Sequence, residues 1–203
     1  MANIRTSASS PLSPRPRKKQ AGPSPKPRVG YLDIETTGLS PQHAQVTVLG
    51  VLCAHKAAWR LSQFFVDSPG NEREVLKRAR KVLESLDYVV TYNGRAFDLP
   101  FLRQRAQLHG LRWPWVETLD LLPLARRFRM QTGRIESCQL GSVMAAFGLE
   151  RNDALGGADC IDAYQRWLQR GRKRDRAGIL EHNAVDIWAL PEVERALSAA
   201  LEE

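Results

Sequence analysis

The sequence predicts an α/β domain in which a mixed β-sheet is flanked by α-helices. Apolar, β-branched runs of strand length alternate with segments whose apolar residues recur at helical spacing. The first three strand-like runs follow one another closely, which favours an antiparallel meander, and the later ones alternate with helices. The 203 residues, with 43% hydrophobic content, are enough for a single domain with a sizeable core.

The first half of the chain carries the clearest strand signals. Residues 29–35 form an apolar run that we expect to be the central strand, and residues 45–53 and 59–66 are rich in β-branched and aromatic side chains. Residues 71–86 show helical spacing of apolar residues, with charges on the opposite face. Residues 88–92 predict a further strand, because they end in an Asn-Gly turn signal.

The second half is mainly helical. A helix is expected over residues 98–109, with Pro100 in its first turn and Gly110 as its stop, followed by a short strand over 118–122. Apolar spacing then predicts helices over residues 124–130, 140–147, 160–168 and 175–201. Pro191 is expected to interrupt the last of these, because proline lacks the N–H that a helix interior requires.

Residues 1–28 differ in composition from the rest and predict a disordered basic tail before a domain at 29–203. They contain seven Lys or Arg, six Pro and no acidic residue, whereas the whole chain has a net charge of +8. Such a segment has too little apolar surface to offset the entropy of ordering. Its charge favours nucleic-acid binding, and its proline spacing is compatible with a protein partner. A transit peptide remains an alternative.

Composition also limits the compartment. The three cysteines are scattered and lack a C-x-x-C pair, as is typical of reduced thiols in an intracellular protein. There is no apolar run long enough for a membrane span and no secretory signal pattern. We therefore expect a soluble, cytoplasmic protein without a membrane partner.

Residues 31–39 read YLDIETTGL and contain the most informative pair of side chains. In a strand, Asp33 and Glu35 point to the same face, where two like charges destabilise a sheet. A divalent cation would reverse that effect, because Mg²⁺ and Mn²⁺ prefer carboxylate oxygens. The alternative is an edge strand whose acids are simply solvated.

Two further motifs contain acids at element boundaries or in apolar surroundings. Residues 92–102, YNGRAFDLPFL, place Asp98 where a helix starts, a position that helix capping alone would also explain. Residues 181–190, EHNAVDIWAL, place His182 and Asp186 on one helix face. An ordinary polar stripe is the alternative interpretation of that pair.

Taken in order, the three motifs resemble those of the DEDD family of 3′-5′ exonucleases, and most closely its YprB-like branch. The residues GRIESCQL at 133–140, LERND at 149–153 and the pair His182-Asn183 also resemble that branch. The resemblance covers nearly all of residues 29–203 and implies a ribonuclease H-like fold. Better-known branches have Tyr four residues, or His five residues, before the last Asp, whereas this chain has His at the four-residue spacing.

The resemblance implies a metal-dependent 3′-5′ exonuclease that hydrolyses terminal phosphodiester bonds of single-stranded DNA or RNA. It implies two divalent cations, Mg²⁺ or Mn²⁺, and a histidine that orients or deprotonates water. The implied metal carboxylates are Asp33, Glu35, Asp98 and Asp186, with His182 as the catalytic histidine. The implied substrate-binding residues are Thr36, Thr37, Gly38, Leu39, Asn93 and Phe97.

A non-catalytic nucleic-acid or partner-binding module with the same fold is the competing hypothesis. The sequence favours the enzyme, because a binding module has no need for four acids and a histidine in this order.

Overall fold

A five-stranded mixed sheet forms the middle layer of the protein in the computed structural model, which describes residues 27–55 and 58–202. The strands are β1 (Val29–Thr36), β2 (Val46–His55), β3 (Ala58–Phe65), β4 (Tyr88–Thr91) and β5 (Glu117–Asp120). Their order is β3-β2-β1-β4-β5. The β1–β2 and β2–β3 pairs are antiparallel, whereas β1–β4 and β4–β5 are parallel. β1 is therefore the central strand, as predicted, and the sheet is mixed with helices beside it, which confirms the predicted α/β architecture.

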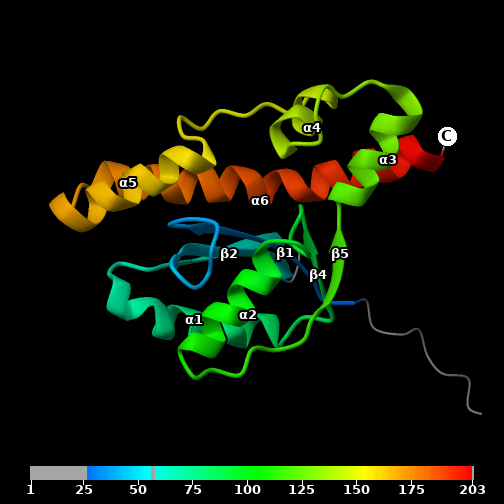
Figure 1. Cartoon of the computed structure of the whole chain (residues 1–203). Helices are drawn as coiled ribbons and strands as arrows, with labels where there is room; N and C mark the ends of the chain where they lie inside the picture. The colour runs from blue at the N-terminus through cyan, green and yellow to red at the C-terminus, as the bar shows by residue number, and fades with distance from the viewer. Residues whose placement is uncertain (1–26, 56–57, 203) are drawn as a thin grey trace, which may run out of the picture.

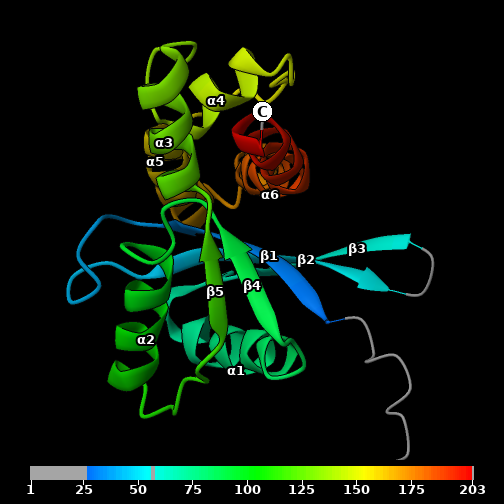
Figure 2. The ribbon, with the colours of Figure 1, turned by 90° about the vertical axis from the view of Figure 1, so that its right-hand side faces the viewer.

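Helices cover both faces of this sheet (Figures 1 and 2). The short 3₁₀ turn η1 (Pro69–Asn71) leads into α1 (Glu72–Leu83), which lies with α2 (Asp98–Leu108) on one face. The other face is covered by α3 (Leu122–Thr132), α4 (Leu140–Ala146), α5 (Gly157–Arg170) and α6 (Lys173–Glu202).

The alternation of side chains along β1 divides the core between these two faces. Leu32 and Ile34 pack in the cluster beneath α1 and α2, whereas Tyr31 packs in the cluster formed with α3, α4 and α6. Because alternate residues share a face, Asp33 and Glu35 lie on the side of α6. The predicted tail lies outside the described residues except for its last two positions, 27 and 28. Among the helices of the described residues, none is long and apolar enough to cross a membrane.

The last helix differs from the prediction, because α6 runs through Pro191 without a break. Proline removes one hydrogen bond and destabilises a helix interior by about 3 kcal/mol. On both sides of Pro191, however, α6 buries apolar side chains, including Ile187, Leu190, Val193 and Leu197. Continuous packing over the sheet and against α3 outweighs the local cost of the proline.

A glycine on β2 allows α6 to lie close to the sheet. A Cβ atom at Gly50 would lie 2.1 Å from Ile187 Cδ1 and 2.4 Å from Asn183 Oδ1. Gly50 pairs with Asp33 across the β1–β2 ladder, so this close approach occurs beside the predicted site. Ile187 has a flexible end that can shift. Asn183 is held by hydrogen bonds and has little freedom to do so.

We expect Gly50→Ala to destabilise the fold by about 1–3 kcal/mol, because the added methyl group overpacks this contact. The measurement is the free energy of unfolding by urea. Gly141→Ala is the matched control, since a Cβ at this helical position meets nothing within 4 Å and alanine favours a helix. Equal stability of Gly50→Ala and the parent protein would contradict the role given to Gly50.

Candidate active site

Three carboxylates from two elements meet above β1. Asp33 and Glu35 project from this strand toward α6, and Asp186 projects from α6 toward them. One oxygen from each of the three lies within 4.8 Å of the others. This arrangement of oxygen donors suits a hard divalent cation such as Mg²⁺ or Mn²⁺.

Asp98 reaches the same region from the start of α2. It is the first residue of α2, and its Oδ1 accepts a hydrogen bond from the backbone N–H of Ile34 at 3.2 Å. The carboxylate is buried, and its bond to the backbone between Asp33 and Glu35 places it beside the three-carboxylate cluster, where its charge raises the pKa of Asp33. Phe97 occupies the N-cap position without a capping side-chain bond, so helix capping does not account for Asp98.

His182 lies one helical turn before Asp186 and faces the same cluster. Its Nε2 is 3.7 Å from Glu35 Oε1 and 3.9 Å from Asp186 Oδ2. The ring is buried, and its other nitrogen, Nδ1, faces the carboxylate of Asp153, outside the cluster. The four-residue spacing between His182 and Asp186 therefore brings the imidazole to the edge of the carboxylate cluster.

Asn183 fixes the position of Asp33. Its Nδ2 donates to Asp33 Oδ2 at 2.8 Å and to the Asp33 carbonyl at 3.2 Å, and its Oδ1 accepts from Gln63 Nε2 at 3.0 Å. Its side chain is completely buried. The sequence singles out Asn183 only as half of a His-Asn pair and indicates no role for it.

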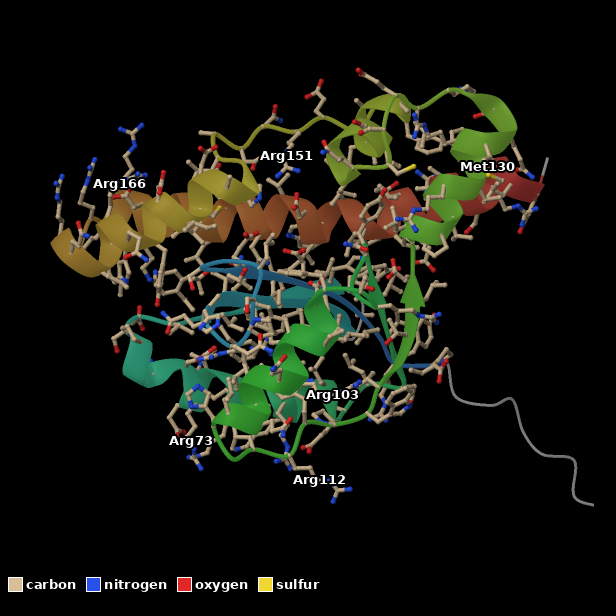
Figure 3. All side chains as sticks on the ribbon, viewed as in Figure 1. Arg73, Arg103, Arg112, Met130, Arg151 and Arg166 are labelled. Carbon is tan, nitrogen blue, oxygen red and sulfur yellow. The ribbon has the colours of Figure 1, made fainter. Side chains whose placement is uncertain are left out.

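Arg151 and Asp153 complete the surroundings of His182 and also had no predicted role. They lie in the segment between α4 and α5, and Figure 3 shows Arg151 pointing from that segment toward α6. Arg151 Nη1 donates to Asp186 Oδ1 at 2.6 Å. Asp153 Oδ2 lies 2.5 Å from His182 Nδ1. The charged string LERND was the signal in the sequence that marked these two residues.

The protonation of Asp153 determines which nitrogen of His182 is free. Burial raises the pKa of Asp153, but hydrogen bonds with His182 and Arg151 outweigh that effect and lower it below its usual value. An ionised carboxylate only accepts hydrogen bonds, so His182 Nδ1 must carry the proton that it donates. Arg151 Nη2 lies 2.8 Å from the same Nδ1, and it donates instead to Asp153 Oδ2 at 3.0 Å. In the neutral ring, Nε2 is then the nitrogen whose lone pair faces the carboxylate cluster.

Burial and mutual repulsion raise the pKa values of the clustered acids. Burial is the main cause for Glu35, with repulsion from Asp186 next, and its pKa rises to about 8. Burial also raises the pKa of Asp98 to about 7. The pKa of Asp33 is raised by burial and then by Glu35, and that of Asp186 by burial against the opposing charge of Arg151. A bound cation would relieve this repulsion.

The segment after β1 forms a rim beside the carboxylates. Thr36 Oγ1 donates to the Gly38 carbonyl at 2.8 Å, and Thr37 Oγ1 accepts from the Gln45 backbone N–H at 3.0 Å. Leu39 follows with 84% of its surface exposed. The two threonines thus shape this turn, and they leave the Leu39 side chain free for contact with a ligand.

The turn after β4 presents the other two predicted substrate-binding residues. Asn93 is exposed and has a φ of 64°, and its backbone N–H donates to Asp120 Oδ1 at 2.8 Å. Asp120 also accepts from the backbone N–H of Arg95 at 3.0 Å, so one carboxylate organises the turn. Phe97 is half-buried against Phe101, with ring centroids 5.5 Å apart. Nothing in the sequence had marked Asp120, which acts from β5.

The chain matches a family model of the RNase_H superfamily over residues 30–198. It is 27% identical to the uncharacterised protein YprB of Bacillus subtilis over 165 residues, which is 79% of this chain and 39% of YprB. A DNA polymerase of Thermococcus litoralis is 46% identical over 50 residues, 24% of this chain and 3% of the polymerase. The chain thus spans well under half the length of these two relatives.

Solved structures share the fold at low sequence identity. The family B DNA polymerase of Pyrobaculum calidifontis superposes with a TM-score of 0.67 and 18% identity, over 88% of this chain and 25% of the polymerase. NrnC of Brucella melitensis, solved with bound Mg²⁺, gives 0.57 and 17%, over 87% of this chain and 75% of NrnC. Exonuclease I of E. coli with a dT13 oligonucleotide gives 0.56 and 14%, over 85% and 40%.

The raised pKa values predict a pH-dependent stability for the metal-free protein. In the folded state the clustered acids keep protons that they release above about pH 4.5 in the unfolded chain. This difference in proton binding stabilises the folded state, and the stabilisation is fully present below that pH. It is lost as the pH rises through the folded pKa of Glu35, about 8. In chelator, we expect the free energy of unfolding to fall between about pH 5 and about pH 8.5.

Urea unfolding at several pH values measures this dependence. Glu35→Gln should make this fall shallower without abolishing it, because Asp33, Asp98 and Asp186 also have raised pKa values. A variant whose stability falls as steeply as that of the parent protein would show that Glu35 is not the responsible group.

Proposed function

Because the chain belongs to the RNase_H superfamily and shares its fold with an exonuclease and a DNA polymerase, we propose that it is a metal-dependent 3′-5′ exonuclease acting on single-stranded nucleic acid. The observation that carries the proposal is the convergence of Asp33, Glu35 and Asp186 within 4.8 Å, beside buried Asp98 and His182. A nuclease function fits this family and its exonuclease neighbours. The direction of hydrolysis, the single-stranded substrate and the use of two metals belong to the proposal.

The donor set fits two divalent cations, Mg²⁺ or Mn²⁺. Four carboxylates from β1, α2 and α6 supply hard oxygen ligands, and their pKa values are raised by burial first and then by repulsion between negative charges. Asp33, Glu35, Asp98 and Asp186 would hold the ions. When bound, such cations supply Lewis-acid stabilisation of the attacking and leaving oxygens of a phosphodiester.

His182 would accept the proton of the attacking water. Its Nδ1 donates to Asp153, which leaves the lone pair of Nε2 directed at Glu35 and Asp186. An imidazole with one nitrogen fixed by a carboxylate is a suitable general base near neutral pH. Asn183 and Arg151 would be positioning residues, because Asn183 holds Asp33 and Arg151 holds Asp186 through hydrogen bonds.

The terminal nucleotide would lie between the two rims of the site. Leu39 would pack against its base as an apolar wedge, with Thr36, Thr37 and Gly38 offering backbone contacts. Asn93 and Phe97 would line the opposite rim, at the turn that Asp120 organises.

The direct test uses the purified full-length protein with 5′-labelled single-stranded DNA and RNA of the same sequence. With Mg²⁺ or Mn²⁺ we expect a ladder that shortens from the 3′ end, and with chelator no degradation. Asp33→Asn should lower the rate at least about 100-fold, since even groups that only support metal ligands contribute 10- to 100-fold. Exposed Asp162 on α5 provides the matched control, and Asp162→Asn should retain the parent rate.

Folded protein that degrades neither strand in either metal would contradict the proposal and favour a non-catalytic binding module. Shortening from the 5′ end would contradict the direction alone.

A further inference from the structure

A buried thiol lies close to Glu35 and His182. Cys160 is in the first turns of α5, and its side chain is 1% exposed. One ligand atom each from Glu35, Cys160 and His182 lies within 4.8 Å of the other two. None of the sequence motifs had included this cysteine, and the proposed hydrolysis does not use it.

We propose that Glu35, Cys160 and His182 form a Zn²⁺ site that overlaps the carboxylate cluster and shares Glu35 with it. Bonds of about 2.0–2.3 Å to a tetrahedral zinc place its ligand atoms roughly 3.3–3.8 Å apart. The 3.7 Å between His182 Nε2 and Glu35 Oε1 already has that length. The thiol completes the set after side-chain shifts of about 1 Å. A water molecule fills the fourth position.

Asp153 gives independent support, because it stands behind the imidazole. Histidines that bind zinc commonly donate their second ring N–H to a carboxylate, which fixes the tautomer and the ring orientation. His182 Nδ1 makes this bond to Asp153 Oδ2 at 2.5 Å, and the Asp153 side chain is 1% exposed. The imidazole is thus prepared to bind a cation through Nε2.

The two overlapping donor sets select different ions. Three or four carboxylates favour Mg²⁺ or Mn²⁺, whereas thiolate and imidazole favour Zn²⁺. Zinc at this position withdraws Glu35 from the carboxylate cluster and takes the lone pair of His182 Nε2. Zn²⁺ therefore inhibits the Mg²⁺-dependent reaction. This inhibition rests on the proposed exonuclease function, whereas zinc binding itself does not.

Cobalt absorption tests the binding directly, because a thiolate bonded to Co²⁺ gives a charge-transfer band in the near ultraviolet. The chelator-treated full-length protein is titrated with Co²⁺, and Zn²⁺ is then added to displace it. We expect the band in the parent protein and its loss in Cys160→Ala and Cys160→Ser. Cys138→Ala is the matched control and keeps the band, since this half-buried cysteine belongs to neither donor set.

A parent protein without the band, or a Cys160→Ala variant that keeps it, overturns the proposal. If both Cys160 variants fail to fold, Asp153→Asn gives a separate readout. Loss of the supporting carboxylate should lower the Co²⁺ affinity by about 10- to 100-fold, and an unchanged affinity again overturns the zinc site.

Inhibition is measured with single-stranded DNA and Mg²⁺ while Zn²⁺ is increased. We expect the zinc concentration for half inhibition to rise at least about tenfold in Cys160→Ala, whose rate without zinc stays at the parent level. Equal inhibition of both proteins overturns the role of Cys160. A parent protein that shows the cobalt band but no degradation in Mg²⁺ contradicts the exonuclease and leaves the zinc site intact.

Discussion

The close contact of α6 with the sheet at Gly50 is the constraint on which the site depends. Because β2 has no side chain there, Asn183 reaches across to Asp33 with hydrogen bonds to both its carboxylate and its carbonyl. The same contact brings His182 and Asp186 within about one side-chain length of β1. A helix displaced by even a methyl group would separate the two halves of the carboxylate cluster.

Placing four acids close together destabilises the folded state, and neighbouring groups offset part of this destabilisation. Burial and repulsion raise the pKa values of the acids that face one another, while Arg151 places positive charge against Asp186. Asp98 is held by a backbone N–H and Asp33 by an amide, so each carboxylate keeps its orientation. These groups favour a site that is arranged before any cation binds, as effective catalysis requires.

Much of this arrangement could be predicted from local patterns. The alternation along β1 predicted that Asp33 and Glu35 share a face, and helical spacing predicted that His182 faces the same way as Asp186. What could not be predicted depends on tertiary contacts. Asp120 organises the turn at Asn93 from a neighbouring strand, and Asp153 reaches His182 from a segment without regular structure.

The predicted break of the last helix at Pro191 was wrong for a related reason. The proline predicted a local break, but the apolar residues on either side of it are buried over the sheet, and their packing keeps α6 continuous. A local propensity was overridden by long-range burial, which a single sequence does not display. The role of Gly50 was missed for the same reason, since its importance lies in the helix that approaches it.

The most direct measurement is a Mn²⁺ titration of the chelator-treated full-length protein, with free Mn²⁺ followed by electron paramagnetic resonance. We expect saturable binding of two ions to the parent protein, and weaker binding to Asp186→Asn, because α6 supplies one of the clustered carboxylates. Folded protein that leaves all of the Mn²⁺ free would contradict the claim that these acids are gathered to bind metal.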